Sequence, residues 1–380
     1  MKILKYIILI LILWGFPTFA LFYISPAMGS ATSYLTIALA MVYYILNKDK
    51  KGLMWPFIIL GLTYYTLAGL NYTGVSDREF FTNFIKFILI VVCCADLARK
   101  TTLNEIYVIL IFGALSVVCH SVFFANIDAH FGSNYGRFSG FYLNPNYAAI
   151  ICLSGFSISY GIKNSKLKLL GQLVFSFAGL LTLSRYFFSI WILMNLLGMV
   201  KSKKNMVTPA IGVAVLVLIL TFGGEGLKLN TSRFEALNSL FDSEEQVHTE
   251  TINRDSRADT WATYYDIILD KPFLGNGYRK LQGRHFGLWA GVHNTYLMVI
   301  GEAGIIPFLV LIWIIGTLFI KGVFYYNSEP EYFFLNIVVV TSLLVGHTYF
   351  EKFSNIFFTL FLYARLIEFK RNESGVQKND

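Results

Sequence analysis

Three observations predict an all-α polytopic membrane protein with about twelve transmembrane helices and one large loop outside the membrane. Only 14% of the 380 residues are charged, whereas soluble domains carry about 25%. Hydrophobic residues make up 56% of the chain, and apolar runs near the roughly 20 residues that cross a bilayer recur from end to end. Lysine and arginine concentrate in alternate loops, as the orientation of membrane helices requires.

The apolar runs give the expected order of the helices. They are 4–24, 29–47, 53–70, 80–98, 103–124, 144–162, 167–184, 186–200, 206–223, 293–320, 332–350 and 353–369. The first run is longer than the apolar part of a signal peptide, and PAMGSA is a poor cleavage site, so we expect an uncleaved helix there. The whole chain, 1–380, then forms one transmembrane domain, and the polar stretch 224–292 is a large loop within it.

Charge placement orients these spans, because short cytoplasmic loops carry excess lysine and arginine. With the N-terminus inside, the inner segments hold Lys2, Lys5, Lys48, Lys50, Lys51, Arg99, Lys100, Lys163, Lys166, Lys168, Lys201, Lys203, Lys204, Lys321, Lys370, Arg371 and Lys378. The short outer loops hold only Arg78, Arg137, Arg185 and Lys352. We therefore expect both termini in the cytoplasm and the 224–292 loop outside.

Composition and cysteine placement also argue against three features. The net charge of +8 follows mostly from the loop asymmetry, and the sequence offers no basic soluble face for nucleic acid. The cysteines fall inside predicted spans, so neither a disulfide framework nor a zinc site is expected. These cysteines are Cys93, Cys94, Cys119 and Cys152.

The residues able to do chemistry gather on the predicted outer side. A charged side chain at the centre of a membrane helix costs roughly 2.5–3.5 kcal/mol, so functional groups should collect at a rim or line a cavity. The outer stretches are YGRFSGFYLNPNYAA (135–149), LTLSRYFFS (181–189), NRDSRADTWATYYDIILDKPFLGNGYRK (253–280) and HNTYL (293–297).

Two of these stretches offer arginines to an anion. Arg185 ends one span and begins another with almost no loop, so its guanidinium either anchors at the interface or meets an anion. Arg254, Arg257 and Trp261 share one face of a helix that Lys271-Pro272 should stop. Such a helix could lie on the membrane surface or grip phosphate, whose oxygens match the forked donors of arginine.

His293 opens its span, where the positive end of the helix dipole favours a neutral imidazole. A neutral ring can accept a proton from an attacking hydroxyl; otherwise His293 simply caps the helix.

Elsewhere, Lys86 lies within its span, where it either snorkels outward or adds charge to an anion cavity. His347 and Glu351 are four residues apart, a spacing that favours a structural pair on a helix.

Four motifs follow one another over about 135–312: RFSGFYLNPNYAA, LTLSR, R…W…KPFLGNGY and HNTYL…GEAGIIPFL. In their order and spacing they resemble the O-antigen ligase and O-antigen polymerase superfamily. The resemblance implies a membrane fold similar to the metal-independent C-type glycosyltransferases. It also implies a bacterial inner-membrane enzyme with its active site on the periplasmic face.

The resemblance assigns roles to particular residues. His293 matches the family's essential histidine, and Arg185 and Arg257 match arginines that hold a diphosphate. We group Arg254 with these two arginines. Arg137 matches a recurrent basic position of less defined role, and further substrate-binding candidates are Asn144, Asn294 and Trp261.

The implied reaction moves a glycan from undecaprenyl diphosphate to a sugar hydroxyl with inversion, without a metal or other cofactor. The compact outer loop and HNTYL, in place of the serine-containing version of that motif, favour a polymerase that uses a lipid-linked repeat unit as acceptor. The alternative is a ligase that uses lipid A-core. The expected partners are these lipids and a chain-length regulator, with no nucleic acid. A third hypothesis is a transporter of lipid-linked sugars. Such a transporter needs charged groups near the midplane of the membrane, where Lys86 and Glu302 are the main candidates.

Overall fold

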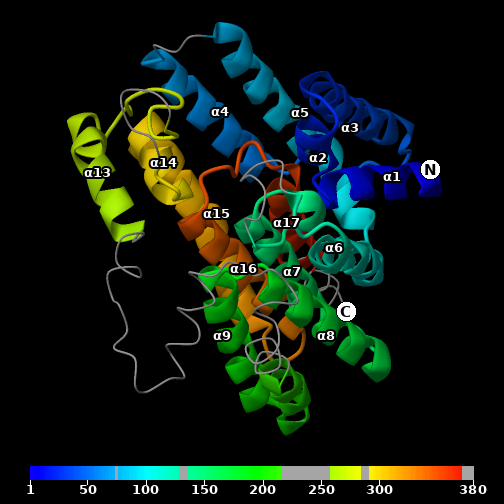
Figure 1. The fold of residues 1–380 in the computed structure, drawn as a ribbon. Coiled ribbons are helices and arrows are strands. Elements are labelled where there is room, and N and C mark those ends of the chain that lie inside the picture. The colour runs from blue at the N-terminus through cyan, green and yellow to red at the C-terminus, as the bar shows by residue number, and fades with distance from the viewer. Residues whose placement is uncertain (73–75, 128–135, 215–256, 284–290, 370–380) are drawn as a thin grey trace, which may run out of the picture.

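The computed structural model describes residues 1–72, 76–127, 136–214, 257–283 and 291–369, and this part of the chain is helical with no strand (Figure 1). The helices are α1 (Lys2–Leu13), α2 (Phe16–Tyr23), α3 (Pro26–Leu46), α4 (Trp55–Leu70), α5 (Asp77–Lys100), α6 (Leu103–Phe123), η1 (Gly140–Tyr142), α7 (Pro145–Ser159), α8 (Ser165–Leu181), α9 (Arg185–Lys201), η2 (Lys203–Met206), α13 (Arg257–Asp270), α14 (Thr295–Ala303), α15 (Ile305–Phe324), α16 (Pro330–Val345), α17 (Phe353–Tyr363) and η3 (Ala364–Phe369).

The protein is a polytopic membrane protein. Among the described helices, α3, α5, α6 and α15 are each long and apolar enough to cross a bilayer, and α1 with α2 adds a fifth span if the bent pair counts as one. The predicted spans each coincide with a helix or a helix pair, except 206–223, of which only 206–214 is described. The total of about twelve spans therefore stays a prediction.

Two predicted continuous helices are broken, which corrects the sequence-based bounds. The run 4–24 bends by 60° between α1 and α2, where Gly15 has a left-handed φ of +61°. The run 293–320 is interrupted at Gly304, whose φ is +83° and whose Cβ, if present, would lie 2.1 Å from the carbonyl oxygen of Phe273. Glycine is required there because the chain after α13 passes directly over the break.

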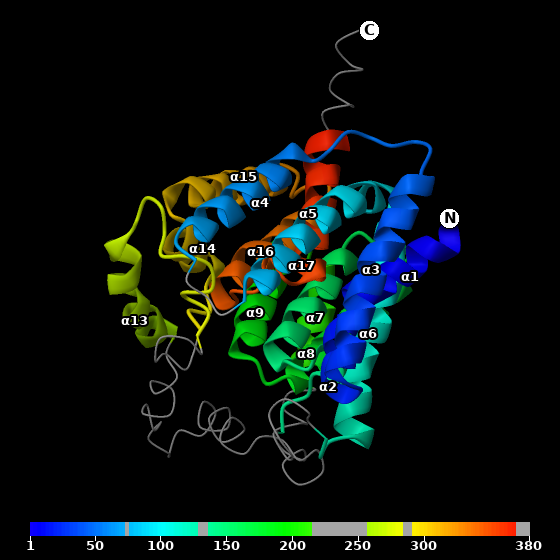
Figure 2. The ribbon, with the colours of Figure 1, turned by 90° about the horizontal axis from the view of Figure 1, so that it is seen from above.

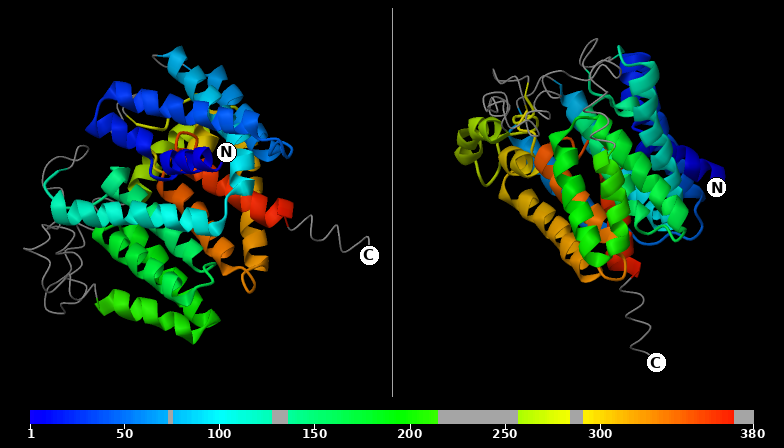
Figure 3. Two further views of the ribbon diagram at one scale, coloured as in Figure 1. Left: turned by 90° about the vertical axis from the view of Figure 1, so that its right-hand side faces the viewer. Right: turned by 60° about the horizontal axis from the view of Figure 1, so that its bottom comes forward.

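Helix α7 forms the centre of one half of the molecule. It packs against α6, α8, α9 and α16, and the green helices α7 to α9 lie beside α6 in Figure 3. All its side chains except Asn146 are buried. Small residues let the neighbours approach closely: a Cβ on Gly155 would lie 2.3 Å from the ring of Phe175.

The other half joins α4, α5, α14, α15 and α17, which pack in pairs and lie together in Figure 2. Glu302 on α14 is fully buried. Its carboxylate accepts hydrogen bonds from the Tyr64 hydroxyl (2.6 Å), the Leu281 N–H (3.0 Å) and the Gln282 side-chain amide (3.1 Å). These bonds tie the segment after α13 to the bundle, so Glu302 has a structural task that does not require a transport path.

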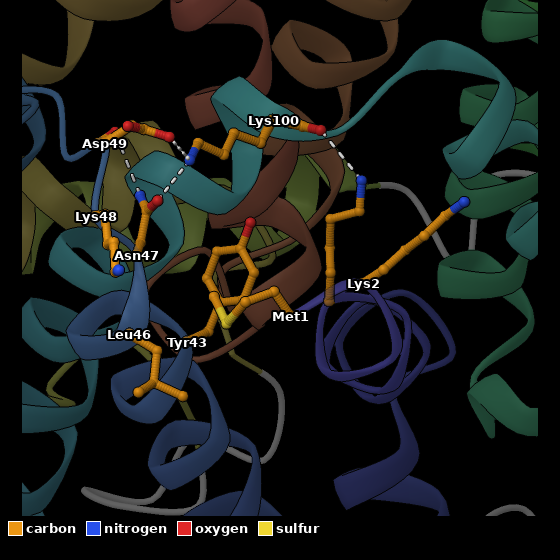
Figure 4. A pocket seen from close by; sticks show the side chains of 9 residues that line it. Met1, Lys2, Tyr43, Leu46, Asn47, Lys48, Asp49 and Lys100 are labelled. Atoms are coloured by element: carbon orange, nitrogen blue, oxygen red, sulfur yellow. Dashed lines mark hydrogen bonds and ion pairs between the residues drawn. The ribbon is translucent and has the colours of Figure 1, made fainter.

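At one end of the bundle, two lysines predicted to face the cytoplasm form hydrogen bonds and ion pairs with neighbouring helices. The Lys100 ammonium donates to the Asn47 side-chain oxygen (2.5 Å) and lies 3.5 Å from Asp49 (Figure 4). Lys5 donates to Glu105 (2.6 Å) and to the Lys100 carbonyl (3.2 Å). These contacts border a cavity of about 580 Å³ and fasten the ends of α1, α3, α5 and α6 together.

Candidate functional site

A second cavity, of about 550 Å³, lies between α2, α7, α9, α13, α14 and the segment that joins α16 to α17. We call it the cationic cavity, after six basic side chains that line it: Arg137, Arg185, Arg257, His293, His347 and Lys352. No aspartate or glutamate is among the described residues that line it. Such a composition suits a ligand with several negative charges.

Four helices begin at the cationic cavity. The first residues or caps of α7, α9, α14 and α17 line it, including Asn144, Arg185, Thr295 and Lys352. The unpaired N–H groups and the dipole at a helix N-terminus favour an anion. The backbone therefore adds positive potential to that of the side chains.

Three of these helix starts share an uncommon backbone conformation. Leu143, Leu183 and His293 have φ of 59°, 46° and 47°, and each directly precedes the N-cap of α7, α9 or α14. Left-handed residues with side chains are rare, and each carries a conformational cost. Because surrounding contacts must hold these turns, the geometry of the cavity is imposed by the fold.

Arg137 is buried against the ends of two helices. Its exposed fraction is 4%, its Nε donates to the Thr182 carbonyl (3.0 Å), and its Nη2 donates to the Asn146 side-chain oxygen (3.0 Å). The same oxygen accepts from the Ser184 hydroxyl (2.9 Å), one residue before Arg185. Arg137 thus connects the start of α7 to the start of α9 and helps fix the position of Arg185.

Arg257, the first described residue of α13, reaches across to the C-terminal end of α16. Its Nη1 donates to the Val345 carbonyl (2.7 Å) and to the His293 carbonyl (3.5 Å). A cation at a helix C-terminus is favourable. Thr295 supports the same join by donating to the Gly346 carbonyl (2.7 Å). As predicted from Lys271-Pro272, α13 stops at Asp270.

His293 faces a second histidine that sequence reasoning did not assign to the site. Its exposed ring lies 4.8 Å from that of His347, centroid to centroid, at an interplanar angle of 59°. The expected helical pair of His347 with Glu351 is wrong: α16 ends at Val345, and Glu351 instead accepts from Arg279 (3.1 Å). Burial, with His293, Arg257 and Arg279 nearby, lowers the pKa of His347 to about 4.

A pH dependence of stability follows from His347. Because its folded pKa of about 4 lies below the ordinary value near 6.5, the unfolded chain binds more protons between these values. Stability should therefore be complete above about pH 6.5 and fall as the pH drops toward 4. Melting curves of purified protein across this range should show a flatter decline for His347→Asn; equal slopes would contradict the assignment.

Lys352 was predicted only as an outer-loop charge, yet it lines the cationic cavity. Its ammonium donates to the Thr18 hydroxyl (3.2 Å) and lies 4.9 Å from the centre of the Tyr147 ring. Burial lowers its pKa, and the neighbouring Glu351 acts in the opposite direction. An anion in the cavity would favour the charged form further.

The remaining candidates lie apart from this lining. Arg254 is outside the described residues. Trp261 is partly buried on α13 and packs against the core. Asn294 is 4% exposed, and its side chain caps α14 by accepting from the Leu297 N–H (3.1 Å). Neither Trp261 nor Asn294 lines the cavity, whereas Arg137, Asn144, Arg185, Arg257 and His293 do.

The cap at Asn294 makes a simple prediction. Replacing Asn294 by alanine removes the cap and should lower the stability by about 1 kcal/mol, whereas aspartate should restore it. Thermal melts of the two variants measure this difference. An alanine variant with unchanged melting but lost substrate binding would instead support a direct role in binding.

Comparison with known proteins finds a similarity in this region. A family model described as O-antigen ligase matches residues 170–312. The match confirms the resemblance over that range, and it includes Arg185, Arg257 and His293. No curated protein matches the chain. Among the described residues, no three histidine, cysteine, aspartate or glutamate side chains are grouped as metal ligands would be.

Proposed function

We propose that this protein moves a glycan from undecaprenyl diphosphate to a sugar hydroxyl, because residues 170–312 match a family model described as O-antigen ligase, a family of membrane enzymes that transfer glycans. The observation that carries the proposal is the cationic cavity, which joins His293 to three arginines and a lysine, with no carboxylate among its described lining residues. We place the reaction at the periplasmic face of the bacterial inner membrane, in a chain of about twelve spans with both termini cytoplasmic.

The diphosphate of the donor is the proposed occupant of the cavity. Arg185 and Arg257 lie on different helices around it, so the two guanidinium groups can approach the phosphates from different sides. Arg254 is a further proposed ligand of the diphosphate. Charge grows on the bridging oxygen as the glycosidic bond breaks, and fixed cations that neutralise it lower the barrier. The N-termini of α7, α9, α14 and α17 support the same charge.

His293 is the proposed general base. The acceptor hydroxyl attacks the anomeric carbon and transfers its proton to an imidazole nitrogen, while the bond from that carbon to the phosphate oxygen breaks. The electron pair leaves with undecaprenyl diphosphate, so one glycosidic bond forms as another is lost. Direct attack inverts the anomeric centre and, as proposed, requires no metal. The positive φ of His293 holds the ring at the start of α14.

We propose a lipid-linked repeat unit as acceptor, which makes the protein a surface-polysaccharide polymerase. The compact outer loop and HNTYL support this choice. Asn144 and Arg137 at the start of α7 are proposed contacts of the sugar or phosphate. A ligase would use the same donor chemistry with lipid A-core. The hydrogen-bonded burial of Glu302 weighs against a transporter, which would need charged groups along its path.

An assay with purified protein tests the proposal. A defined undecaprenyl-diphosphate oligosaccharide is offered with equal amounts of lipid-linked repeat unit and lipid A-core, and the products are separated by mass. We expect extension of the repeat unit and release of undecaprenyl diphosphate. Glycan on lipid A-core would make the protein a ligase. Movement of labelled lipid across vesicles without a new glycosidic bond would refute the enzyme.

A further inference from the structure

Lys86 is a cation for which the proposed reaction has no use. It lies on α5, one of the helices long and apolar enough to span a membrane, about 13 Å along the helix from its start, at roughly 1.5 Å per residue. Its ammonium lies 4.6 Å from the centre of the Tyr34 ring. No carboxylate of the described residues forms an ion pair with it. A lone cation within a span is a candidate functional group.

Lys86 opens onto a separate cavity of about 230 Å³, which we call the side cavity. It lies between α2, the first turns of α3, α5 and the start of α17. Its polar lining includes Ser30, Ser33, Lys86 and Lys352. Because one water takes up about 30 Å³, the side cavity has room for a phosphoryl group together with several waters.

The side cavity and the cationic cavity meet at a shared wall. Thr18, Tyr147 and Lys352 line both. The bond from Lys352 to the Thr18 hydroxyl (3.2 Å) spans this wall. Lys352 can therefore contact an anion on either side by a change in its side-chain torsions.

The side cavity keeps a net positive charge. Glu351 lines it, and its carboxylate lies 3.1 Å from Arg279, whose charge is shared with Glu79 (2.7 Å). Against this one carboxylate, Lys86 and Lys352 leave an excess of one positive charge among the described lining residues. Lys86 is half-buried: its ammonium contacts the Tyr34 ring and lines an open pocket that adjoins the cationic cavity.

We propose that the side cavity is a second binding site for a phosphorylated lipid headgroup, where a polyprenyl diphosphate waits before or after reaction. Lys86 and Lys352 hold the phosphate, and Ser30 and Ser33 donate hydrogen bonds to it. The lipid tail leaves past α2 and α3, where the exposed side chains include the apolar Leu21 and Met28. This inference deepens the proposed function, since a staging site has a purpose only if the cationic cavity uses such a lipid.

Binding stoichiometry tests the site without relying on glycan transfer. Geranyl diphosphate, a soluble short-chain analogue, is titrated into purified protein by calorimetry. We expect two molecules per chain, one per chain for Lys86→Met, and one per chain for the Arg185→Ala, Arg257→Ala double variant. A single molecule per wild-type chain, or two per Lys86→Met chain, would overturn the inference.

Kinetics add a readout that a structural role would not change. Lys86→Met should raise the KM for the lipid donor about tenfold, because a charged contact is lost, while kcat stays within about twofold. Lys86→Arg should retain most binding. Lys166→Met, at an exposed lysine in the first turn of α8, is the matched control and should change neither constant. A fall in kcat with unchanged KM would contradict a staging role.

The probes also separate the source of the phosphate and the two proposals. If inorganic diphosphate fills both sites as geranyl diphosphate does, the phosphate alone is recognised; if it fills only the cationic cavity, the side cavity requires the lipid. Two bound molecules without glycan transfer would support the second binding site in the side cavity and contradict the proposed enzyme activity. Glycan transfer with only one bound molecule would support the enzyme activity and contradict the second binding site.

Discussion

Replacing His293 by alanine should reduce glycan transfer by about 10²–10⁴-fold while donor binding persists. The imidazole is the proposed acceptor of the hydroxyl proton. His347, whose ring lies 4.8 Å from that of His293, has its pKa lowered to about 4 and is a weak base. Transfer is measured on purified protein with a defined lipid-linked donor. Wild-type rates in the alanine variant would remove His293 from the mechanism.

The backbone at this position calls for a second variant. His293 has φ of 47°, a conformation that asparagine tolerates better than alanine. His293→Asn therefore keeps the turn and removes the base. If the asparagine variant melts like the wild type and is still inactive, loss of the base explains the result. Activity restored by asparagine would show that only the turn mattered.

Replacing Arg257 by lysine should lower kcat by about 10²–10³-fold, the loss typical when one electrostatic stabiliser is removed. Arg257 already bonds the Val345 carbonyl (2.7 Å), and a guanidinium has five N–H donors with which to bond a phosphate as well. A lysine ammonium is a point charge that cannot reproduce the forked geometry.

Steady-state kinetics with the lipid donor measure this loss. Arg78→Lys is the matched control, since Arg78 is exposed at the start of α5 and does not line the cationic cavity. It should behave as wild type. Full activity of Arg257→Lys would contradict the diphosphate clamp, and an equal loss in Arg78→Lys would indicate a general effect of the substitution.

Hydropathy located the helices because burial in lipid requires long apolar runs, but it could not locate their breaks. Residues 4–24 and 293–320 are apolar on both sides of Gly15 and Gly304, so their pattern matches that of continuous spans. The break at Gly304 packs closely against the Phe273 carbonyl, a contact between segments far apart in the sequence. Single-segment patterns carry no information about such contacts.

The sequence could predict candidate site residues where polar side chains are rare, but it could not predict those whose position depends on tertiary contacts. Arg185, Arg257 and His293 are polar groups at the edges of apolar runs, and they line one cavity. His347 was missed because the sequence predicted a helical pair with Glu351, whereas α16 ends at Val345, two residues before His347. A signal was present: Gly346-His347-Thr348-Tyr349 resembles the local order Gly291-Val292-His293-Asn294-Thr295-Tyr296. Asn294 caps α14 by accepting from the Leu297 N–H, and its predicted contact with substrate stays a prediction.

Part of the attraction for anions resides in main-chain amides at the starts of α7, α9, α14 and α17, which no side-chain replacement can delete. Ordinary laboratory anions such as sulfate and inorganic phosphate should therefore occupy the pocket and compete with substrate, even in arginine-depleted variants. Buffer choice becomes an experimental variable: rates measured in phosphate should be lower than those in an uncharged buffer at equal ionic strength.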